Sequence, residues 1–327
     1  MDFSFDSLVA LLVTMPIMFG MAFSPRLLPV QQLLLGSSGL FTRDLPKTVY
    51  RGLILEFNIN HTNGASPVIT IDSLLAFVSR ISIVIDGQDY LISLQARDLY
   101  YMNQADYSVA PFSSLFVTVS STGTSTFQIY IPLALSRALR PEDTLLDARK
   151  VSTVVLEIQT GSSIGTGVTT INSANVNILT DEYANAPAEM ATGRHEMNAI
   201  DRNLDATGLI QQTLEVGSNN QYRRLLVFTR TTGGALDNSQ IAGIAVRSRS
   251  FYYANVTLDQ MLQQWSTQLF GLAFQTGMYP VPFTRDGQMT QRVDARNLSE
   301  LVVEVTSLVS NGTMRIVKDK AIFASEA

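Results

Sequence analysis

The chain has 327 residues, of which 46% are hydrophobic and only 16% charged, and its net charge is −5. This balance excludes an intrinsically disordered chain, and the lack of any block of Lys or Arg argues against direct binding of nucleic acid. The absence of Cys excludes disulfides, zinc fingers and thiol chemistry.

An apolar segment lies near the N-terminus. Residues 8–23, LVALLVTMPIMFGMAF, carry no charge, but a spanning helix needs roughly 20 apolar residues, and Pro16 and Gly20 interrupt this run. Three interpretations stay open: an arm that packs on neighbouring subunits or a bilayer, a helix buried in its own domain, and a membrane anchor. The side chains expected to contact a membrane or a neighbour are Leu8, Val9, Leu11, Leu12, Met15, Ile17, Met18, Phe19 and Phe23.

From Tyr50 onward, apolar and polar residues alternate with the period of two that is typical of half-buried strands. In YRGLILEFNIN, for example, Leu53, Leu55 and Phe57 share one face. RISIVIDG is a second such strand, and its closing Asp-Gly predicts a turn. Further strands are predicted at 115–120, 126–132, 152–159, 174–179, 210–216, 223–229, 242–253, 299–306 and 313–318.

Three helices and one connection interrupt the strands. Helices are predicted over 94–104, over 141–150, which opens with Pro and two acidic residues, and over 256–268, where Thr257 and Gln260 form a capping box. The apolar stripe of the last helix consists of Leu258, Met261, Leu262 and Trp265. Residues 181–208 have no period and are rich in Ala, Asn, Asp and Gly, so they are interpreted as a linker.

One stretch occurs twice. DARKVSTVVLEIQT begins at Asp147, and DARNLSELVVEVTS begins 147 residues later (294 − 147) at Asp294. The predicted inward positions are apolar in both copies, and because a slip of one residue would turn the core face outward, both copies specify the same register. Duplication of a β-domain explains this better than chance similarity of two amphipathic strands. Val155 and Val302 are apolar at predicted outward positions, which makes them candidate interface residues.

The sequence therefore predicts a mainly β protein with two tandem eight-stranded sandwiches of the jelly-roll type, each with an accessory helix. The expected division is an N-terminal arm at 1–45, a first jelly roll at 46–180, a linker at 181–208 and a second jelly roll at 209–327.

Four passages resemble one known family. ISIVIDGQDYLISLQARDLYYMNQ resembles a strand that ends in Asp-Gly before a helix, and FQIYIPLALSRALRPEDTLLDARKVSTVVLEIQT resembles the passage that follows it. IAGIAVRSRSFYYANVTLDQMLQQ and MTQRVDARNLSELVVEVTS are their counterparts in the second half. In this order they resemble the double jelly-roll major capsid proteins of icosahedral viruses with an internal membrane. Lipid-containing bacteriophages are the nearest group, in particular the Flavobacterium-infecting type.

Two features depart from the family. The second half lacks the Asp-Gly turn, and the first 45 residues have no counterpart in the shorter members. The resemblance implies a structural protein, not an enzyme, that trimerises into pseudo-hexameric capsomers and builds an icosahedral shell around an internal membrane. It further implies a virion location after assembly in the host cytoplasm. The implied partners are further copies of the chain, vertex or penton proteins and a lipid membrane, without direct nucleic-acid contact, and no cofactor is expected.

Two residue patterns bear on other functions. GSSIG matches the G-x-S-x-G motif around Ser163, and Asp181 and His195 follow in hydrolase order, but the motif lies in a Gly/Ser/Thr loop between strands. A weak calcium site would draw on Asp86, Asp89, Glu142 and Asp143, although no EF-hand spacing exists and solvated turns are expected. The main alternative to the shell protein is a tandem β-sandwich module that binds carbohydrate or a receptor.

Overall fold

The computed structural model describes most of the chain after residue 24. The described residues are 25–35, 39–107, 110–135, 144–183, 186, 193–217, 220–258, 276–283 and 292–323. The apolar residues from Leu8 to Phe23 lie outside them, as does the helix predicted over 256–268 from residue 259 onward. The structure of these two segments therefore stays a prediction, while Val256 and Thr257, the described start of the predicted helix, belong to a strand instead.

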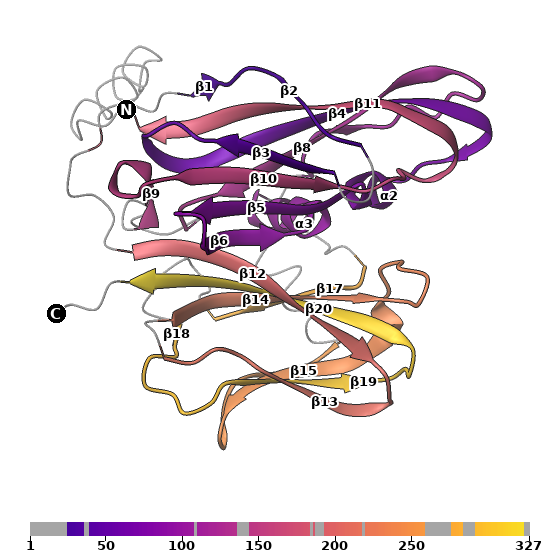
Figure 1. Ribbon diagram of the computed structural model, residues 1–327. Helices are drawn as coiled ribbons and strands as arrows, with labels where there is room; N and C mark the ends of the chain where they lie inside the picture. The colour runs from indigo at the N-terminus through magenta and orange to yellow at the C-terminus, as the bar shows by residue number, and fades with distance from the viewer. Residues whose placement is uncertain are drawn as a thin grey trace, which may run out of the picture.

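Two sheets enclose a common core in the first half of the chain, the upper half of Figure 1. The first sheet contains β1 (Arg26–Leu27), β2 (Gln31–Gln32), β4 (Val49–Val68), β7 (Ser113–Ser114), β8 (Thr122–Pro132), β9 (Leu146–Asp147) and β11 (Thr166–Tyr183). The second contains β3 (Leu40–Asp44), β5 (Val78–Ile85), β6 (Asp89–Leu94) and β10 (Val154–Thr160). The helical elements are α2 (Ile71–Ala76), α3 (Ala96–Tyr107) and the 3₁₀ turn η2 (Ala148–Lys150). We call this unit the first sandwich.

The second half forms a second sandwich around its own core, in the lower half of Figure 1. One side contains β12 (Gly193–Leu204), β14 (Asn220–Arg230), β17 (Met278–Pro282), β18 (Val293–Asp294) and β20 (Gly312–Phe323). The other contains β13 (Gly208–Thr213), β15 (Ile241–Ser248), β16 (Phe251–Thr257) and β19 (Val302–Ser307), and the 3₁₀ turn η3 spans Asn238–Gln240.

The strand neighbours are the same in both sandwiches. The order β3–β10–β5–β6 in the first corresponds to β13–β19–β15–β16 in the second, and β11–β4–β8 corresponds to β20–β14–β17. Strand β12, which pairs with β20, takes the place that β1 and β2 take beside β11. The whole sandwich is thus repeated, as the duplicated stretch predicts.

The repeat also holds for single residues. Val154, Leu156 and Ile158 of β10 are at most 2% exposed. Their counterparts by sequence offset, Leu301, Val303 and Val305, are all 0% exposed. The two copies therefore bury the same positions in the same register, which confirms this prediction.

A parallel pairing joins the two sandwiches. Met197 and Asn198 of β12 pair with Ile92 and Ser93 of β6, so a continuous sheet runs through both units. In Figure 1 β12 lies between the two bodies. The interpretation of 181–208 as an irregular linker is wrong for 193–204, because this polar segment gains its pairing from β20 and β6, partners that are distant in sequence.

The missing Asp-Gly has a structural substitute. Asp86 follows β5 in a left-handed conformation with φ 51°, and Arg249 follows β15 with the same φ of 51°. A non-glycine residue in this region is uncommon and requires support from its surroundings. Here the backbone N–H of Arg249 donates to Glu300 Oε1 at 3.0 Å, while Asp86 Oδ1 accepts from the backbone N–H groups of Ser152 and Thr153.

Three local predictions are wrong. Residues 144–150, the described part of the helix predicted over 141–150, form β9 and η2, because Leu146–Asp147 pairs with β4. The strand predicted over 242–253 is a hairpin, which turns after Ser248. The strand predicted over 115–120 does not form: residues 115–118 lie beside β8 without joining its ladder, and residues 119–120 form a turn.

Hydrogen bonds from side chains hold residues 116–118 beside β8 in place of backbone strand pairing. Asn63 Nδ2 donates to the carbonyls of Phe116 and Thr118 at 3.2 and 3.1 Å, and the N–H of Phe116 donates to Ser125 Oγ. These bonds occupy the backbone groups through which a strand would pair, which sequence alternation alone does not reveal.

Candidate functional site

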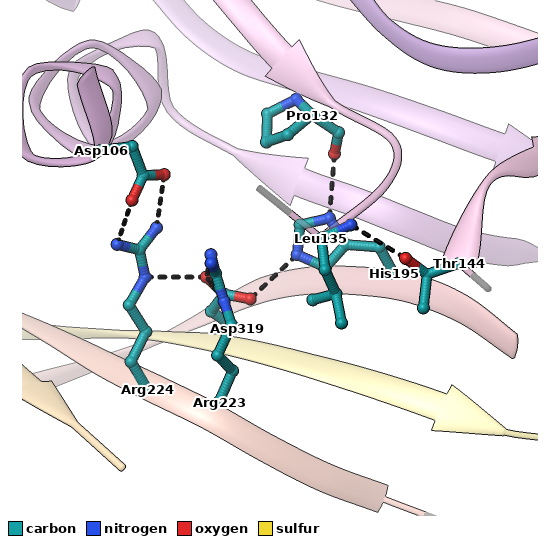
Figure 2. Close-up of polar contacts among 8 residues, drawn as sticks. All are labelled: Asp106, Pro132, Leu135, Thr144, His195, Arg223, Arg224 and Asp319. Carbon is teal, nitrogen blue, oxygen red and sulfur yellow. Dashed lines mark hydrogen bonds and ion pairs between the residues drawn. The ribbon is translucent and has the colours of Figure 1, made fainter. Parts of the chain in front are cut away.

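The contact between the two sandwiches contains a buried group of charged side chains, shown in Figure 2. Arg224 of β14 donates from Nη1 and Nη2 to the two carboxylate oxygens of Asp106 in α3, at 2.5 and 2.7 Å. Its Nε donates to Asp319 Oδ2 of β20 at 2.8 Å, and Arg223 also donates to this oxygen. We call Asp106, His195, Arg223, Arg224 and Asp319 the junction cluster.

A β-bulge makes the cluster possible. Consecutive residues of a regular strand point to opposite faces. Tyr222 pairs with Lys320 and Arg224 with Asp319, so Arg223 is the extra residue opposite one residue of β20. The bulge brings two consecutive arginines, each 5% exposed, to the same carboxylate.

His195 completes the cluster from β12. Its Nε2 lies 2.9 Å from Asp319 Oδ1, and its Nδ1 lies 3.0 Å from the carbonyl oxygen of Pro132, at the end of β8. His195 thus ties the second sandwich to a strand end of the first.

The arginines of the junction cluster keep its two carboxylates ionised. Burial alone would raise the pKa of Asp319, but the charges of Arg223 and Arg224 outweigh it and hold the pKa well below its usual range. Burial also raises the pKa of Asp106, but the charge of Arg224 outweighs this effect, so the pKa is lowered overall. Both carboxylates are therefore ionised at neutral pH, and the cluster acts as a fixed ionic clamp between the sandwiches.

The two predicted interface residues differ in exposure. Val155 lies in β10 between Val84 and Asp44 and is partly exposed. Val302 opens β19 and is only 6% exposed, so its side chain offers little surface to a neighbour. Their role in an interface stays a prediction, and the geometry favours Val155.

The structure does not assemble the hydrolase residues. Ser163 Oγ donates to the carbonyl of Gly165 in the loop between β10 and β11, and no helix follows it. Asp181 Oδ2 accepts from Arg51 Nε at 2.7 Å, and His195 belongs to the junction cluster. A nucleophile elbow requires a strand followed directly by a helix, so GSSIG is a connecting loop.

The proposed calcium ligands that are described have protein partners. Asp86 receives the N–H groups of Ser152 and Thr153, and Asp89 pairs with Arg194 at 3.1 Å. Glu142 and Asp143 lie outside the described residues. Within the described ranges no three His, Asp or Glu side chains gather closely enough to hold a metal ion. No helix in the described part of the chain is long and apolar enough to cross a membrane.

Sequence reasoning missed the junction cluster, although a signal exists. Arg223 and Arg224 stand together at the start of the strand pattern RRLLVFT, and Asp319 lies between Lys318 and Lys320. Adjacent charges inside apolar strands cannot all face water unless the strand is bulged or its second face is polar. Their partners, Asp106 and His195, are more than 20 positions distant and cannot be assigned without the fold.

No protein-family model and no curated protein matches the chain. Solved structures do match. The major capsid protein of the Sulfolobus turreted icosahedral virus has a TM-score of 0.75 at 15% identity, over 92% of this chain and 97% of that chain. The major capsid protein P2 of bacteriophage PM2 has a TM-score of 0.66 at 10% identity, over 94% and 100%. The PBCV-1 virus capsid protein has a TM-score of 0.62 at 10% identity, over 92% and 94%.

The chain has the double jelly-roll fold. Nearly its whole described length takes part, because each match covers at least 92% of the chain. The fold class expected from strand alternation and from the duplicated stretch is thereby confirmed. At 10–15% identity the likeness concerns the fold, so function requires a separate argument.

Proposed function

We propose that the chain is the structural major capsid protein of an icosahedral virus and that it forms homotrimers. The observation that carries the proposal is the pair of equivalent sandwiches, repeated strand for strand over a fold shared with several major capsid proteins. Two similar sandwiches in one chain allow three chains to imitate six-fold packing, which gives a pseudo-hexameric capsomer.

Direct bonds between the two sandwiches support this proposal. A subunit of a capsid lattice needs a fixed orientation of its two sandwiches relative to each other, because a flexible hinge would prevent regular packing of neighbouring subunits. The β12–β6 pairing joins the halves through backbone bonds, and the junction cluster joins them through buried charges. Low charge, at 16% of residues, suits a protein whose flanks are covered by other copies.

The mass of the purified chain in solution tests the proposal. We expect light scattering after gel filtration to give about three times the 35.9 kDa of one chain. Electron microscopy of the concentrated protein should show pseudo-hexagonal particles or shells. A monomer at micromolar concentration that binds a glycan would contradict the proposal and would support the tandem binding module instead.

The remaining parts of the proposal concern partners and place. The protein belongs in the virion capsid after assembly in the host cytoplasm, where it contacts its own copies and vertex or penton proteins, without a catalytic reaction or a cofactor. Its net charge of −5 suits a shell that an internal membrane separates from the genome. Purified particles are then expected to contain phospholipid, and particles free of lipid would contradict the membrane part alone.

A further inference from the structure

A pocket of about 610 Å³ opens on the outer face of the sheet formed by β4, β8 and β11. Its floor includes Ile54, Tyr130 and Leu179, one from each strand. Two aromatic residues at its wall, Tyr107 and Phe112, are 47% and 56% exposed. Apolar surface of this kind on a folded chain usually marks a binding site.

The polar groups of the pocket are already paired with one another. Arg51 Nε donates to Asp181 Oδ2 at 2.7 Å, and Tyr130 Oη donates to the same oxygen at 3.2 Å. Asn103 bonds the backbone of Tyr130 through both its oxygen and its nitrogen. Because these groups satisfy each other, the pocket favours an apolar occupant. One buried atom, Asp181 Oδ1, has no donor among the described residues, so the occupant needs to supply only one N–H or O–H group.

The chain itself supplies an apolar segment at this place. Pro25 is part of the pocket wall, and the uncharged run 8–23 ends two residues before it. Two residues of chain reach at most about 7 Å, so Phe23 is held close to the pocket by its connection. The segment 136–143 also adjoins the wall through Leu135, but its sequence SRALRPED has four charged residues and does not suit an apolar site.

We infer that residues 8–23 dock into this pocket of their own chain. The tether makes the contact intramolecular, with an effective concentration on the order of millimolar, so even a weak apolar contact is largely formed. The pocket volume lies within the range of about 300–1,000 Å³ of small-ligand sites, so it takes a few side chains of the segment and not all of them. The inference does not depend on the proposed capsid role.

Engineered disulfides test the inference, since the full-length chain has no Cys of its own. Phe112→Cys is combined in turn with Ile17→Cys, Phe19→Cys, Met21→Cys or Phe23→Cys, and each protein is oxidised with glutathione disulfide at low concentration. The matched control replaces Phe112→Cys by Phe251→Cys, because Phe251 is also an exposed aromatic residue, 62% exposed, but lies on the second sandwich. Non-reducing gels and peptide mass spectrometry identify the bonds.

Position 23 is held near the pocket by its connection to Pro25 in any case, so it is a positive control for the oxidation. At least one of positions 17, 19 and 21 is expected to form an intrachain disulfide with residue 112, in a yield about tenfold above the control. Equal yields with both partners, or no disulfide at any of positions 17, 19 and 21, would overturn the inference. Disulfides only between chains would overturn it in favour of a second copy as the host. Flotation with vesicles of phosphatidylcholine and phosphatidylglycerol, without any disulfide, would overturn it in favour of lipid. The mass of the same variants separates the two ideas, since a trimer without the disulfide contradicts only the docking.

Discussion

Arg224 of the second sandwich holds both carboxylate oxygens of Asp106 in the first, at 2.5 and 2.7 Å, across 118 positions of sequence. Both side chains are almost completely buried, with 6% and 3% exposure. Charges removed from water in this way stabilise a contact only when they are paired well, and losing one partner leaves the other uncompensated. The pair therefore makes the relation of the two sandwiches specific.

Removing one charge of this pair should destabilise the whole chain. Asp106→Asn removes the carboxylate that pairs with Arg224 Nη1 and Nη2, and breaking a buried pair costs roughly 3–5 kcal/mol. Asp89→Asn is the matched control, because Asp89 and Arg194 also join the sandwiches but are 61% and 41% exposed. The control should cost less than about 1 kcal/mol. Urea unfolding measures both, and equal losses would refute the clamp.

The stability of the second sandwich should depend on pH through Glu215. Burial opposes ionisation of this residue, but bonds from Lys318 and Lys320 at 2.5 and 2.6 Å outweigh it and lower the pKa from 4.5 to about 2. Because the pKa is lower in the folded state, the stabilisation is complete above about pH 4.5 and is lost as the pH falls towards 2.

Glu215→Gln tests this dependence. The variant should be less stable than the original chain at pH 6, and the difference in the free energy of unfolding should shrink by pH 3.5. Urea unfolding at both pH values gives the two differences. A difference that stays constant or grows in acid would show that the two lysines do not stabilise the ionised carboxylate.

The two outward valines should respond differently to a charge. Val155→Glu places the charge at a partly exposed position, so the monomer should fold while assembly is weakened. Val302→Glu buries a charge at a position that is 6% exposed, and should unfold the chain or destabilise it strongly. Circular dichroism measures folding and light scattering measures assembly. Normal trimers and shells from Val155→Glu would remove this residue from the interface.

The duplicated Asp-Ala-Arg turns should contribute in parallel. Asp147 accepts from Arg149 Nε at 2.8 Å, and Asp294 accepts from Arg296 Nε at 2.9 Å. The Asp147 side chain is 3% exposed and that of Asp294 is 34% exposed, so Asp147→Ala should cost roughly 1.5–3 kcal/mol and Asp294→Ala about 1 kcal/mol. Thermal unfolding compares them, and a cost confined to Asp294→Ala would contradict the equivalence of the turns.

The repeated core was predictable because its signal is local. Leu156 and Val303 each stand in an alternating strand that specifies its own inward face, and the shared Asp-Ala-Arg start fixes their correspondence. The helix expected over 141–150 shows where local signals mislead, since its acidic start resembles a helix cap while Leu146 pairs with Tyr50 of β4. Tertiary pairing outweighed local propensity there.

The junction cluster could not be predicted from the sequence, because it too depends on contacts between residues far apart in the chain. It draws on α3, β12, β14 and β20, and although the adjacent Arg223 and Arg224 are compatible with a bulge, the sequence does not show which distant residues they pair with. The strand β12 was missed as well, because its polar sequence GRHEMNAIDRNL alternates poorly and its pairing comes from both sandwiches.

Cryo-electron microscopy of the assembled protein tests the central claim most directly. The account predicts a closed trimer in which six similar sandwiches surround a three-fold axis, with both halves of every chain in the relation seen here. Particles that contain one chain, or assemblies in which the two sandwiches of a chain lie apart or at variable angles, would contradict it.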